Sequence, residues 1–256
     1  MKFSIITPTY KRRKLLERAV QSVLRQTYTE WEMIIVNDSP DDSSYQVLPF
    51  SVSDPRIHYL ANDTNRGVNY SRNRALDSIS EDSDWVVFLD DDDYLAPDTL
   101  TTFHKLVTSH PKGMWFVTNR AYAGGKLVTK YPKLETWYSY IKDVLILKRC
   151  KGDVTHCIKA NLLTNIRYSK HIKQAEEWLF YYQIALREKI FYHDHNSTLT
   201  DGYDKVSGLN FRKRTRAEQF KTLRVFIREG SELHLLHHPT FLIYLFMRFV
   251  RLCLKP

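Results

Sequence analysis

Residues 85–97, WVVFLDDDDYLAP, restrict what this chain can fold into more than any other stretch. The five residues from Trp85 to Leu89 are apolar, and most are β-branched or aromatic, as is typical of a strand buried on both faces. The carboxylates of Asp90–Asp93 follow at once, where such a strand would leave its sheet. In open α/β sheets, ligands bind outside the carboxyl ends of the strands. The sequence therefore predicts that the acidic run lies in a functional crevice.

Carboxylates as crowded as Asp90–Asp93 repel one another unless a cation lies among them. Oxygen-only ligands suit a hard divalent cation such as Mg²⁺ or Mn²⁺, and such ions commonly bridge to a phosphate-bearing substrate. A polar turn rich in aspartate is the simpler interpretation and stays open at this point. An EF-hand calcium loop is disfavoured, because the run lacks the central glycine and the closing glutamate of that loop.

The apolar segments of the first hundred residues alternate between two periodicities. Strand patterns occur at residues 3–7, 32–36, 57–60 and 85–89. Residues 12–27 carry one apolar stripe of an amphipathic helix, and the loop at 65–75 runs into a second helix. Strands that alternate with helices predict an α/β fold with a mostly parallel, doubly wound sheet.

The first predicted strand ends at Thr7, because Pro8 closes it and opens a loop. Basic residues fill positions 11–14 at the start of the following helix, against the preference of helix N-termini for acids. They either face a phosphate or form a solvated basic turn, and the turn is the favoured interpretation.

Glycine is absent from the chain before Gly67. A dinucleotide-binding G-x-G-x-x-G motif and a P-loop both need glycines just after an early strand. Neither motif can exist before residue 67, and neither can the glycine-rich N-terminal loop of a sugar-phosphate nucleotidylyltransferase. The common dehydrogenases and P-loop NTPases are therefore excluded.

The net charge of +9 is distributed unevenly along the chain. Residues 1–100 hold 11 Lys and Arg against 17 Asp and Glu, whereas residues 101–256 hold 27 against 12. This pattern argues against a nucleic-acid binder and favours an acidic metal-and-nucleotide half joined to a basic half that meets an anionic partner.

The three cysteines are too few for a disulfide scaffold, so we expect a reducing compartment. The N-terminal apolar run is too short for a signal peptide.

Five segments in order resemble glycosyltransferase family 2, whose members have the GT-A fold. The resemblance is close over about residues 3–100 and weaker beyond. The segments are 4–10 (the opening strand and nucleotide-facing loop), 22–28 (the end of the first helix), 35–39 (at the family's V-D-D-G-S), 65–73 (at N-x-G…A-R-N) and 88–93 with Pro97 (the D-x-D region). Asn37 and Ser39 depart from the family pattern, which has Asp and Gly there.

The resemblance implies roles for individual residues in binding a nucleotide-sugar donor. Asp92 would bind the divalent metal, Mn²⁺ or Mg²⁺, and Asp90 would contact the ribose or lie behind the metal. Asp38 would accept a hydrogen bond from the base, which favours a UDP-sugar. Further donor contacts are expected from Thr7, Pro8, Thr9, Tyr10, Asp91 and, near the phosphates, Arg72. For Arg72 a surface salt bridge is the alternative interpretation.

Beyond residue 100 the pattern predicts strands at 114–118 and 190–195 and a hairpin turn at 123–126, and residues 153–159 resemble the family's strand before its acceptor-side helix. Residues 174–180 lie where the family has E-D-W. Trp178 begins the apolar stripe of a helix, which would place Glu176 and Glu177 in its first turn. The family pattern makes Glu177 the catalytic base of an inverting reaction, and Glu176 a second candidate that caps the helix or binds the acceptor.

The remaining features concern the C-terminal part of the chain. No histidine is assigned as a metal ligand, because segment 201–207, where the family often has one, contains none. His234, His237 and His238 favour a solvated or interfacial cluster over a zinc site. Residues 241–254 are almost wholly apolar but too short to span a bilayer, which needs about 20 residues. They predict either a core helix or an interfacial helix in peripheral contact with a membrane.

The interpretation as a whole is a metal-dependent inverting glycosyltransferase of cell-surface polysaccharide synthesis, with a glycan or lipid-linked acceptor. It would work in the cytoplasm, with the inner face of the cytoplasmic membrane as a peripheral location. The GT-A domain would comprise residues 1–210, with a nucleotide-sugar half (1–100) and an acceptor half (101–210), followed by a basic and apolar helical extension at 211–256. The alternative is a non-catalytic nucleotide-sugar or glycan-binding protein of the same fold, suggested by Asn37, Ser39 and the Glu-Glu pair.

Overall fold

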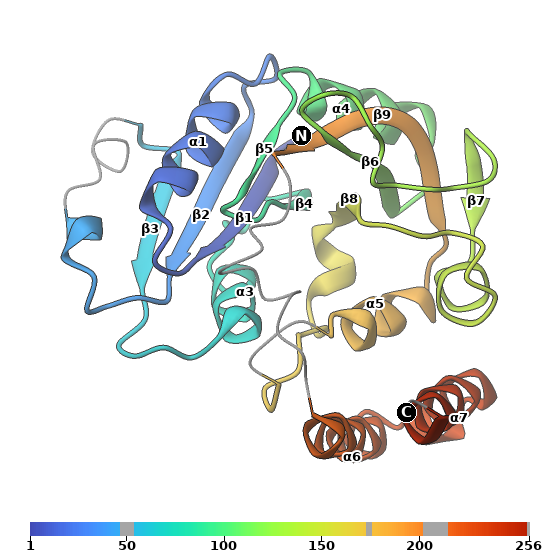
Figure 1. Cartoon of the computed structure of the whole chain (residues 1–256). Helices are drawn as coiled ribbons and strands as arrows, with labels where there is room; N and C mark the ends of the chain where they lie inside the picture. The colour runs from blue at the N-terminus through green and yellow to red at the C-terminus, as the bar shows by residue number, and fades with distance from the viewer. Residues whose placement is uncertain (47–53, 173–175, 202–214, 255–256) are drawn as a thin grey trace.

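A computed structural model describes residues 1–46, 54–172, 176–201 and 215–254. One nine-stranded sheet in this part of the chain has the strand order β3-β2-β1-β4-β8-β6-β9-β5, and β7 pairs with β9 (Figure 1). The first four of these strands are β3 (Ile57–Ala61), β2 (Trp31–Asn37), β1 (Phe3–Thr9) and β4 (Trp85–Phe88), and they are parallel. This half of the sheet confirms the predicted parallel arrangement.

The second half of the sheet is mixed. It contains β8 (Val154–Lys159), β6 (Trp115–Tyr122), β9 (Ile190–Thr200), β5 (Asp93–Leu95) and β7 (Thr136–Tyr138). β8 runs antiparallel to both β4 and β6, β9 is parallel to β6, and β5 and β7 are antiparallel to β9. A turn over residues 123–126 follows β6, as predicted, and Tyr122 N–H donates to the Lys126 carbonyl across it.

Strand β1 is longer than predicted and includes Pro8. Its pairing with β4 ends at Ile6, opposite Phe88, whereas its pairing with β2 continues to Thr9. At Pro8 the strand therefore has a neighbour on one side only, an edge-like position where a missing N–H group is tolerated.

Side chains of the central strands alternate between two cores, one on each face of the sheet. Phe3, Ile5 and Val87 belong to one core, which packs on α1 (Arg13–Leu24) and α4 (Thr99–Ser109). Ile6 and Val86 belong to the other, which packs on α3 (Val68–Leu76) and the C-terminal helices. Because both faces are covered, β4 is apolar throughout, as the run ending at Leu89 predicted.

The C-terminal helices complete the second core. They are α5 (Trp178–Ala185), α6 (Arg216–Glu232) and α7 (Pro239–Leu254), and α6 and α7 lie side by side below the sheet in Figure 1. Phe226 of α6 and Phe241 of α7 are fully buried in that core. Segment 215–254 is therefore packed onto the domain and shares its core.

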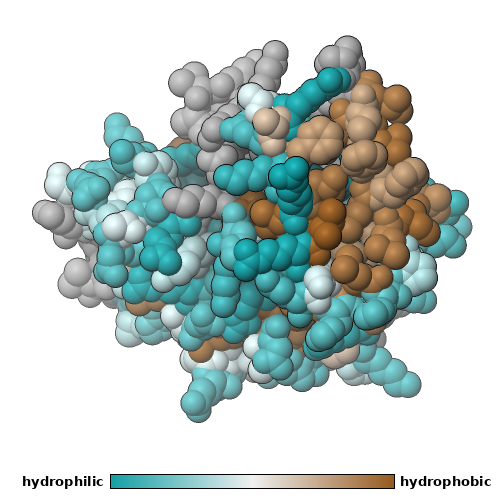
Figure 2. Space-filling view, turned by 90° about the horizontal axis from the view of Figure 1, so that it is seen from below, coloured by the Kyte–Doolittle hydropathy of each residue, from teal (hydrophilic) through white to brown (hydrophobic). Residues whose placement is uncertain are grey.

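Helix α7 has two different faces. Phe241, Leu245 and Leu252 are buried in the core, so the core-helix prediction for 241–254 holds for one face. The other face exposes a set of large apolar side chains: Leu242, Ile243, Phe246, Phe249 and Leu254. Figure 2 shows the hydrophobic surface that they form, seen from below. Among the described helices, none is long and apolar enough to cross a membrane.

Two of the three cysteines, Cys150 and Cys157, are buried, whereas Cys253 in the last turn of α7 is exposed. All three are free thiols, which agrees with the expectation that the chain carries no disulfide scaffold.

Candidate active site

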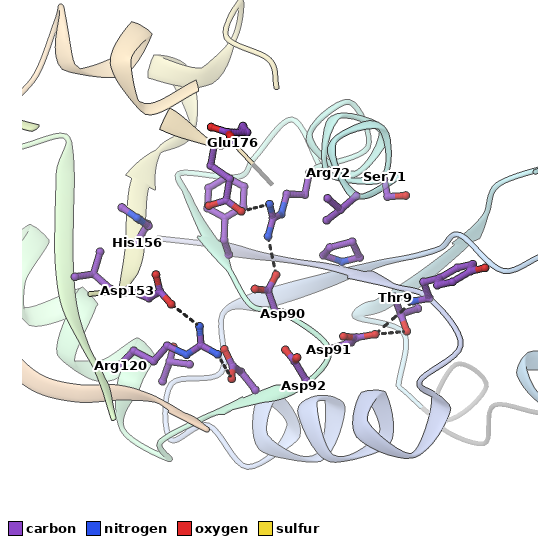
Figure 3. A pocket seen from close by; sticks show the side chains of 18 of the residues that line it. Thr9, Ser71, Arg72, Asp90, Asp91, Asp92, Arg120, Asp153, His156 and Glu176 are labelled. Carbon is purple, nitrogen blue, oxygen red and sulfur yellow. Dashed lines mark hydrogen bonds and ion pairs between the residues drawn. The ribbon is translucent and has the colours of Figure 1, made fainter. Parts of the chain in front are cut away.

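A cavity of about 810 Å³ opens beyond the carboxyl ends of β1 and β4. Its lining joins residues that are far apart in the sequence, from the β1 loop (Pro8 to Arg12), α3, the acidic run, β8 and the start of α5 (Figure 3). Of the predicted donor-side residues, Pro8, Thr9, Tyr10, Asp38, Arg72, Asp90, Asp91 and Asp92 line it, together with Glu176 and Glu177. Thr7 does not line it, because its side chain is buried within β1.

The four aspartates of the acidic run have different partners. Asp91 is buried and accepts a hydrogen bond of 2.8 Å from the Thr9 hydroxyl, which fastens the acidic loop to the β1 loop. Burial raises the pKa of Asp91 to about 7. This carboxylate therefore links two loops at the cavity wall.

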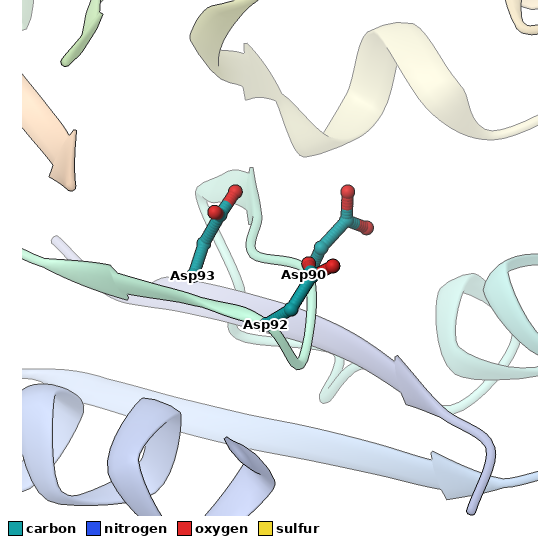
Figure 4. A group of neighbouring side chains, drawn as sticks. All are labelled: Asp90, Asp92 and Asp93. Atoms are coloured by element: carbon teal, nitrogen blue, oxygen red, sulfur yellow. The ribbon is translucent and has the colours of Figure 1, made fainter. Parts of the chain in front are cut away.

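Asp90, Asp92 and Asp93 form a cluster in which one ligand oxygen from each lies within 4.8 Å of the others (Figure 4). Burial raises the pKa of Asp93 to about 7, and burial and then the Asp90 charge raise the pKa of Asp92. Burial is the main cause of both shifts, and the neighbouring carboxylate charges add to it; a cation among the oxygens would offset them. An oxygen-only set of three carboxylates is the chemistry that Mg²⁺ and Mn²⁺ prefer, so the residues present fit such an ion.

Each carboxylate of the cluster is also held by an arginine. Arg12 lies 2.9 Å from Asp92, so this member of the predicted basic turn faces the site instead of the solvent. Arg120 of β6 lies 2.8 Å from Asp93 and 3.1 Å from Asp153. Neither arginine was assigned to the site from the sequence. Arg12 had a signal in the basic cluster, whereas Arg120 had none, because only the sheet order brings β6 close to the acidic run.

Arg72 connects the acidic run to the segment of Glu177 across the cavity. It lies in α3, is 7% exposed, pairs with Asp90 at 2.7 Å and also pairs with Glu177. Burial lowers the pKa of Arg72, but the charges of Glu177 and Asp90 raise it by more, so the guanidinium stays charged. Arg72 thus forms ion pairs, as the alternative interpretation expected, but its own side chain is buried, and its contact with the donor stays a prediction.

Asp38 and the two departures from the family pattern form one loop at the end of β2. Asp38 accepts hydrogen bonds from the backbone N–H groups of Arg66 (2.8 Å) and Gly67 (2.7 Å). The Asn37 side chain accepts from Ser39 N–H at 2.8 Å, and the Ser39 hydroxyl accepts from Lys11 N–H at 2.8 Å. Asn37 and Ser39 thus shape the loop that presents Asp38.

Glu176 and Glu177 do not lie in the first turn of a helix, which corrects that prediction. Helix α5 begins at Trp178, and Glu177 is its N-cap residue without a capping hydrogen bond from its side chain. Glu176 has a φ angle of +80°, which is incompatible with a continuing helix. The carboxylates instead pair with arginines, Glu177 with Arg72 and Glu176 with Arg248 of α7. Arg248 had no signal in the sequence. Residues 174 and 175 of the segment at the E-D-W position, and 202–207, lie outside the described part of the chain.

His156 of β8 also lines the cavity and was not singled out from the sequence. The Trp115 indole N–H donates to His156 Nδ1 at 3.0 Å, and an indole nitrogen can only donate. The imidazole must therefore carry its proton on Nε2. Burial and then the nearby Arg72 charge lower the pKa of His156 to about 3, so the ring is a neutral hydrogen-bond donor.

The family model of Glycosyl transferase family 2 matches residues 4–173. A relative from Campylobacter jejuni, a GalNAc(5)-diNAcBac-PP-undecaprenol beta-1,3-glucosyltransferase, is 30% identical over 207 residues, which are 75% of this chain and 62% of the relative. The chain spans about one third to three fifths of the length of the curated relatives it matches first.

Solved structures share the fold. S. aureus TarS 1-349 in complex with UDP-GlcNAc superposes with a TM-score of 0.74 at 20% identity, over 89% of this chain and 66% of that one. The mannosyltransferase PcManGT from Pyrobaculum calidifontis, in complex with GDP-Man and Mn²⁺, gives a TM-score of 0.63 at 17% identity, over 99% of this chain and 70% of that one. The GT-A fold of the present chain agrees with both.

Proposed function

The chain belongs to glycosyl transferase family 2, and from this premise we propose that it transfers a sugar, with inversion, from a nucleotide-diphosphate sugar to a glycan or lipid-linked acceptor. One observation carries the proposal. The carboxylate cluster of Asp90, Asp92 and Asp93 and the carboxylate of Glu177 lie in the lining of one cavity, with Arg72 paired to both sides. A cation site and a separate base beside one cavity are the two parts that metal-assisted inverting transfer needs.

The donor would occupy the side of the cavity formed by Asp38, the β1 loop (8–10) and the acidic run. A UDP-sugar is favoured, because TarS was solved with UDP-GlcNAc and Asp38 lies where the family's base-binding aspartate is expected. Asp92, with Asp90 and Asp93 beside it, would hold Mn²⁺ or Mg²⁺. When bound, the ion supplies positive charge opposite the leaving diphosphate. PcManGT, solved with GDP-Man and Mn²⁺, is a precedent in the same fold.

Glu177 would accept the proton of the acceptor hydroxyl as that oxygen attacks the anomeric carbon. Arg72 pairs with this carboxylate and helps to fix its position at the cavity. As the bond to the diphosphate breaks, the electron pair leaves with the nucleotide, and the proton stays on Glu177. Glu176, whose carboxylate is paired with Arg248, remains the second candidate.

The test is transfer or donor hydrolysis across a panel of UDP- and GDP-sugars, with Mn²⁺, with Mg²⁺ and with chelator. We expect turnover with a UDP-sugar that chelator abolishes and metal restores. Asp92→Asn should lose this turnover and melt near the wild-type temperature, because the carboxylate lies at a cavity and not in the core. The matched control is Asp63→Asn, an exposed aspartate outside the cavity lining. Full activity in chelator would contradict the metal assignment.

A second candidate function is a non-catalytic binder of nucleotide sugars or glycans. Asn37, Ser39 and the Glu-Glu pair motivate it as departures from the family pattern. A binder would be stabilised thermally by a nucleotide sugar, because ligands that bind the native state raise its melting temperature, but it would show neither transfer nor hydrolysis.

The proposal for the acceptor and the place of action rests on a curated relative and on the C-terminal part of the chain. The C. jejuni relative is named for an acceptor linked to PP-undecaprenol. The exposed apolar face of α7 and the excess of 27 basic over 12 acidic residues at 101–256 suit an interfacial helix beside anionic lipid. We therefore place the protein in the cytoplasm, in peripheral contact with the inner face of the membrane through 241–254, in cell-surface polysaccharide synthesis.

A further inference from the structure

Helix α7 lies beyond the residues that match the family model, yet one of its side chains binds a residue that lines the cavity. Arg248 binds Glu176 with two parallel contacts, Nη2 to Oε1 at 2.9 Å and Nη1 to Oε2 at 2.8 Å. Glu176 is the neighbour of Glu177 and lines the same cavity. A residue about 70 positions further along the chain therefore holds the segment that carries the proposed base.

The position of Arg248 is fixed from several sides. Its guanidinium lies 5.1 Å from the ring centroid of Phe226 in α6, 5.7 Å from Trp178 in α5 and 5.9 Å from Tyr244 in α7. The paired side chains are 26% exposed for Arg248 and 16% for Glu176. A planar fork between aromatic rings that meets a carboxylate at two points is a geometry that lysine cannot reproduce.

The backbone of Glu176 explains why the segment needs such a partner. Its φ angle of +80° is rarely adopted by a residue with a side chain, and this left-handed residue comes directly before the N-cap of α5. Such conformations persist when surrounding contacts over-determine them. On one side of this bend Arg248 holds Glu176, and on the other Arg72 holds Glu177.

We propose that Arg248 is a positioning residue: it holds Glu176 in the left-handed conformation and thereby sets the direction in which Glu177 faces the acceptor. The inference rests on the proposed role of Glu177 as base. It makes α7 a part of the active site, so the helix that presents the exposed apolar face also supports the catalytic carboxylate.

The test compares Arg248→Gln and Arg248→Lys with Arg251→Gln, a matched control that removes an exposed arginine three residues further along the same helix. Because a misplacement of about 1 Å can cost about 10²-fold in rate, we expect kcat to fall by roughly 10- to 100-fold in Arg248→Gln. Arg248→Lys keeps the charge and loses the fork, so its kcat should also fall. The donor KM and donor-induced thermal stabilisation should stay near wild type in both, and Arg251→Gln should match wild type throughout.

The double variant Arg248→Gln with Glu176→Gln separates positioning from general damage. If both residues act through their mutual contact, the double variant should be no slower than Arg248→Gln alone. Wild-type kcat in Arg248→Gln, an equal loss in Arg251→Gln, or losses that multiply in the double variant would each overturn the inference. If Arg248→Gln does not fold, Arg248→Lys and Glu176→Gln decide the question by the same kcat comparison.

Failure of the proposed function gives a different result. In that case the wild type itself would transfer no sugar, whereas if only the base assignment failed, Glu177→Gln would keep full turnover. If Glu177→Gln is inactive while Arg248→Gln turns over normally, the base stands and only the positioning role of Arg248 falls.

Discussion

The four aspartates of the acidic run have the same side chain but different roles, because each has a different partner. In the acidic run, Asp90 is held by Arg72, Asp91 by Thr9, Asp92 by Arg12 and Asp93 by Arg120. These partners come from α3, the β1 loop and β6, so the sequence of the run alone cannot distinguish the four carboxylates. The run predicts a site, and only the tertiary structure divides it into a loop anchor and a candidate metal cluster.

Glu177→Gln is the most direct test of the catalytic base. It keeps the shape of the side chain and removes its basicity, so turnover should fall by about 10²- to 10⁴-fold, the usual contribution of a positioned base. Donor affinity, measured by thermal stabilisation with the nucleotide sugar, should barely change. If Glu176→Gln shows the large loss and Glu177→Gln stays near wild type, the two assignments must be exchanged.

His156 should make the stability of the protein sensitive to mild acid. The pKa of the ring in the native state is about 3, below the ordinary value of 6.5, so below pH 6.5 the unfolded chain binds a proton that the native state does not. The native state therefore loses stability as the pH falls from 6.5 towards 3. His156→Gln removes this titration while its amide oxygen can still accept from the Trp115 indole.

Urea unfolding of the wild type and His156→Gln between pH 7.5 and pH 5 would measure the effect. The free energy of unfolding of the wild type relative to His156→Gln should be highest at pH 7.5 and decrease towards pH 5. A difference that stays constant over this range would show that His156 is protonated to the same extent in both states.

Elements were predicted well where local pattern decides them. The strands at 3–7, 32–36, 57–60 and 85–89 were each found within two residues of their observed ends, because each segment is rich in β-branched and aromatic residues. Element ends were missed where long-range contacts decide them. Strand β1 continues through Pro8 because it still pairs with β2 there, while β4 has already stopped opposite Ile6 and needs no N–H group from Pro8. Helix α5 starts after the two glutamates, whose side chains are bound by Arg72 and Arg248.

Helix α7 allows the membrane contact to be tested without damage to the core. Deletion of the helix would remove Phe241, Leu245 and Leu252 from the core, so point substitutions on the opposite face are better suited. Leu242→Ser with Phe246→Ser removes two side chains that are 48% and 66% exposed. We expect weaker cosedimentation with anionic vesicles and an unchanged melting temperature.

The control for this prediction is Leu134→Ser, which removes an apolar side chain of comparable exposure (55%) in another part of the molecule. It should leave vesicle binding unchanged. Equal binding by the wild type and the double variant would show that the apolar face of α7 does not meet the bilayer.

At the scale of the whole molecule, the fold class could be predicted from the sequence, but the residues that complete the site from the second half of the chain could not. The alternating pattern and the five family-like segments lie mostly within residues 1–100, where each strand is followed by its own loop at the cavity. Arg120 and His156, which line the cavity, come from β6 and β8, and Arg248, which binds the lining residue Glu176, comes from α7. Their positions depend on the mixed strand order and on the packing of α6 and α7, which no local pattern encodes. Residues 211–256 were predicted as an extension. The described part of that segment, 215–254, instead shares the hydrophobic core of the domain that packs on α3 and α5.

The distribution of the three thiols has a practical consequence. Cys150 and Cys157 are shielded from solvent, so a maleimide dye would react with the native chain at Cys253 alone. Cys253 follows Phe246 and Phe249 at helical spacing, on the same stripe of α7 and five residues beyond Arg248. The unmodified sequence thus provides a single fluorescent reporter on this helix, and its emission could follow vesicle contact and turnover in the same sample.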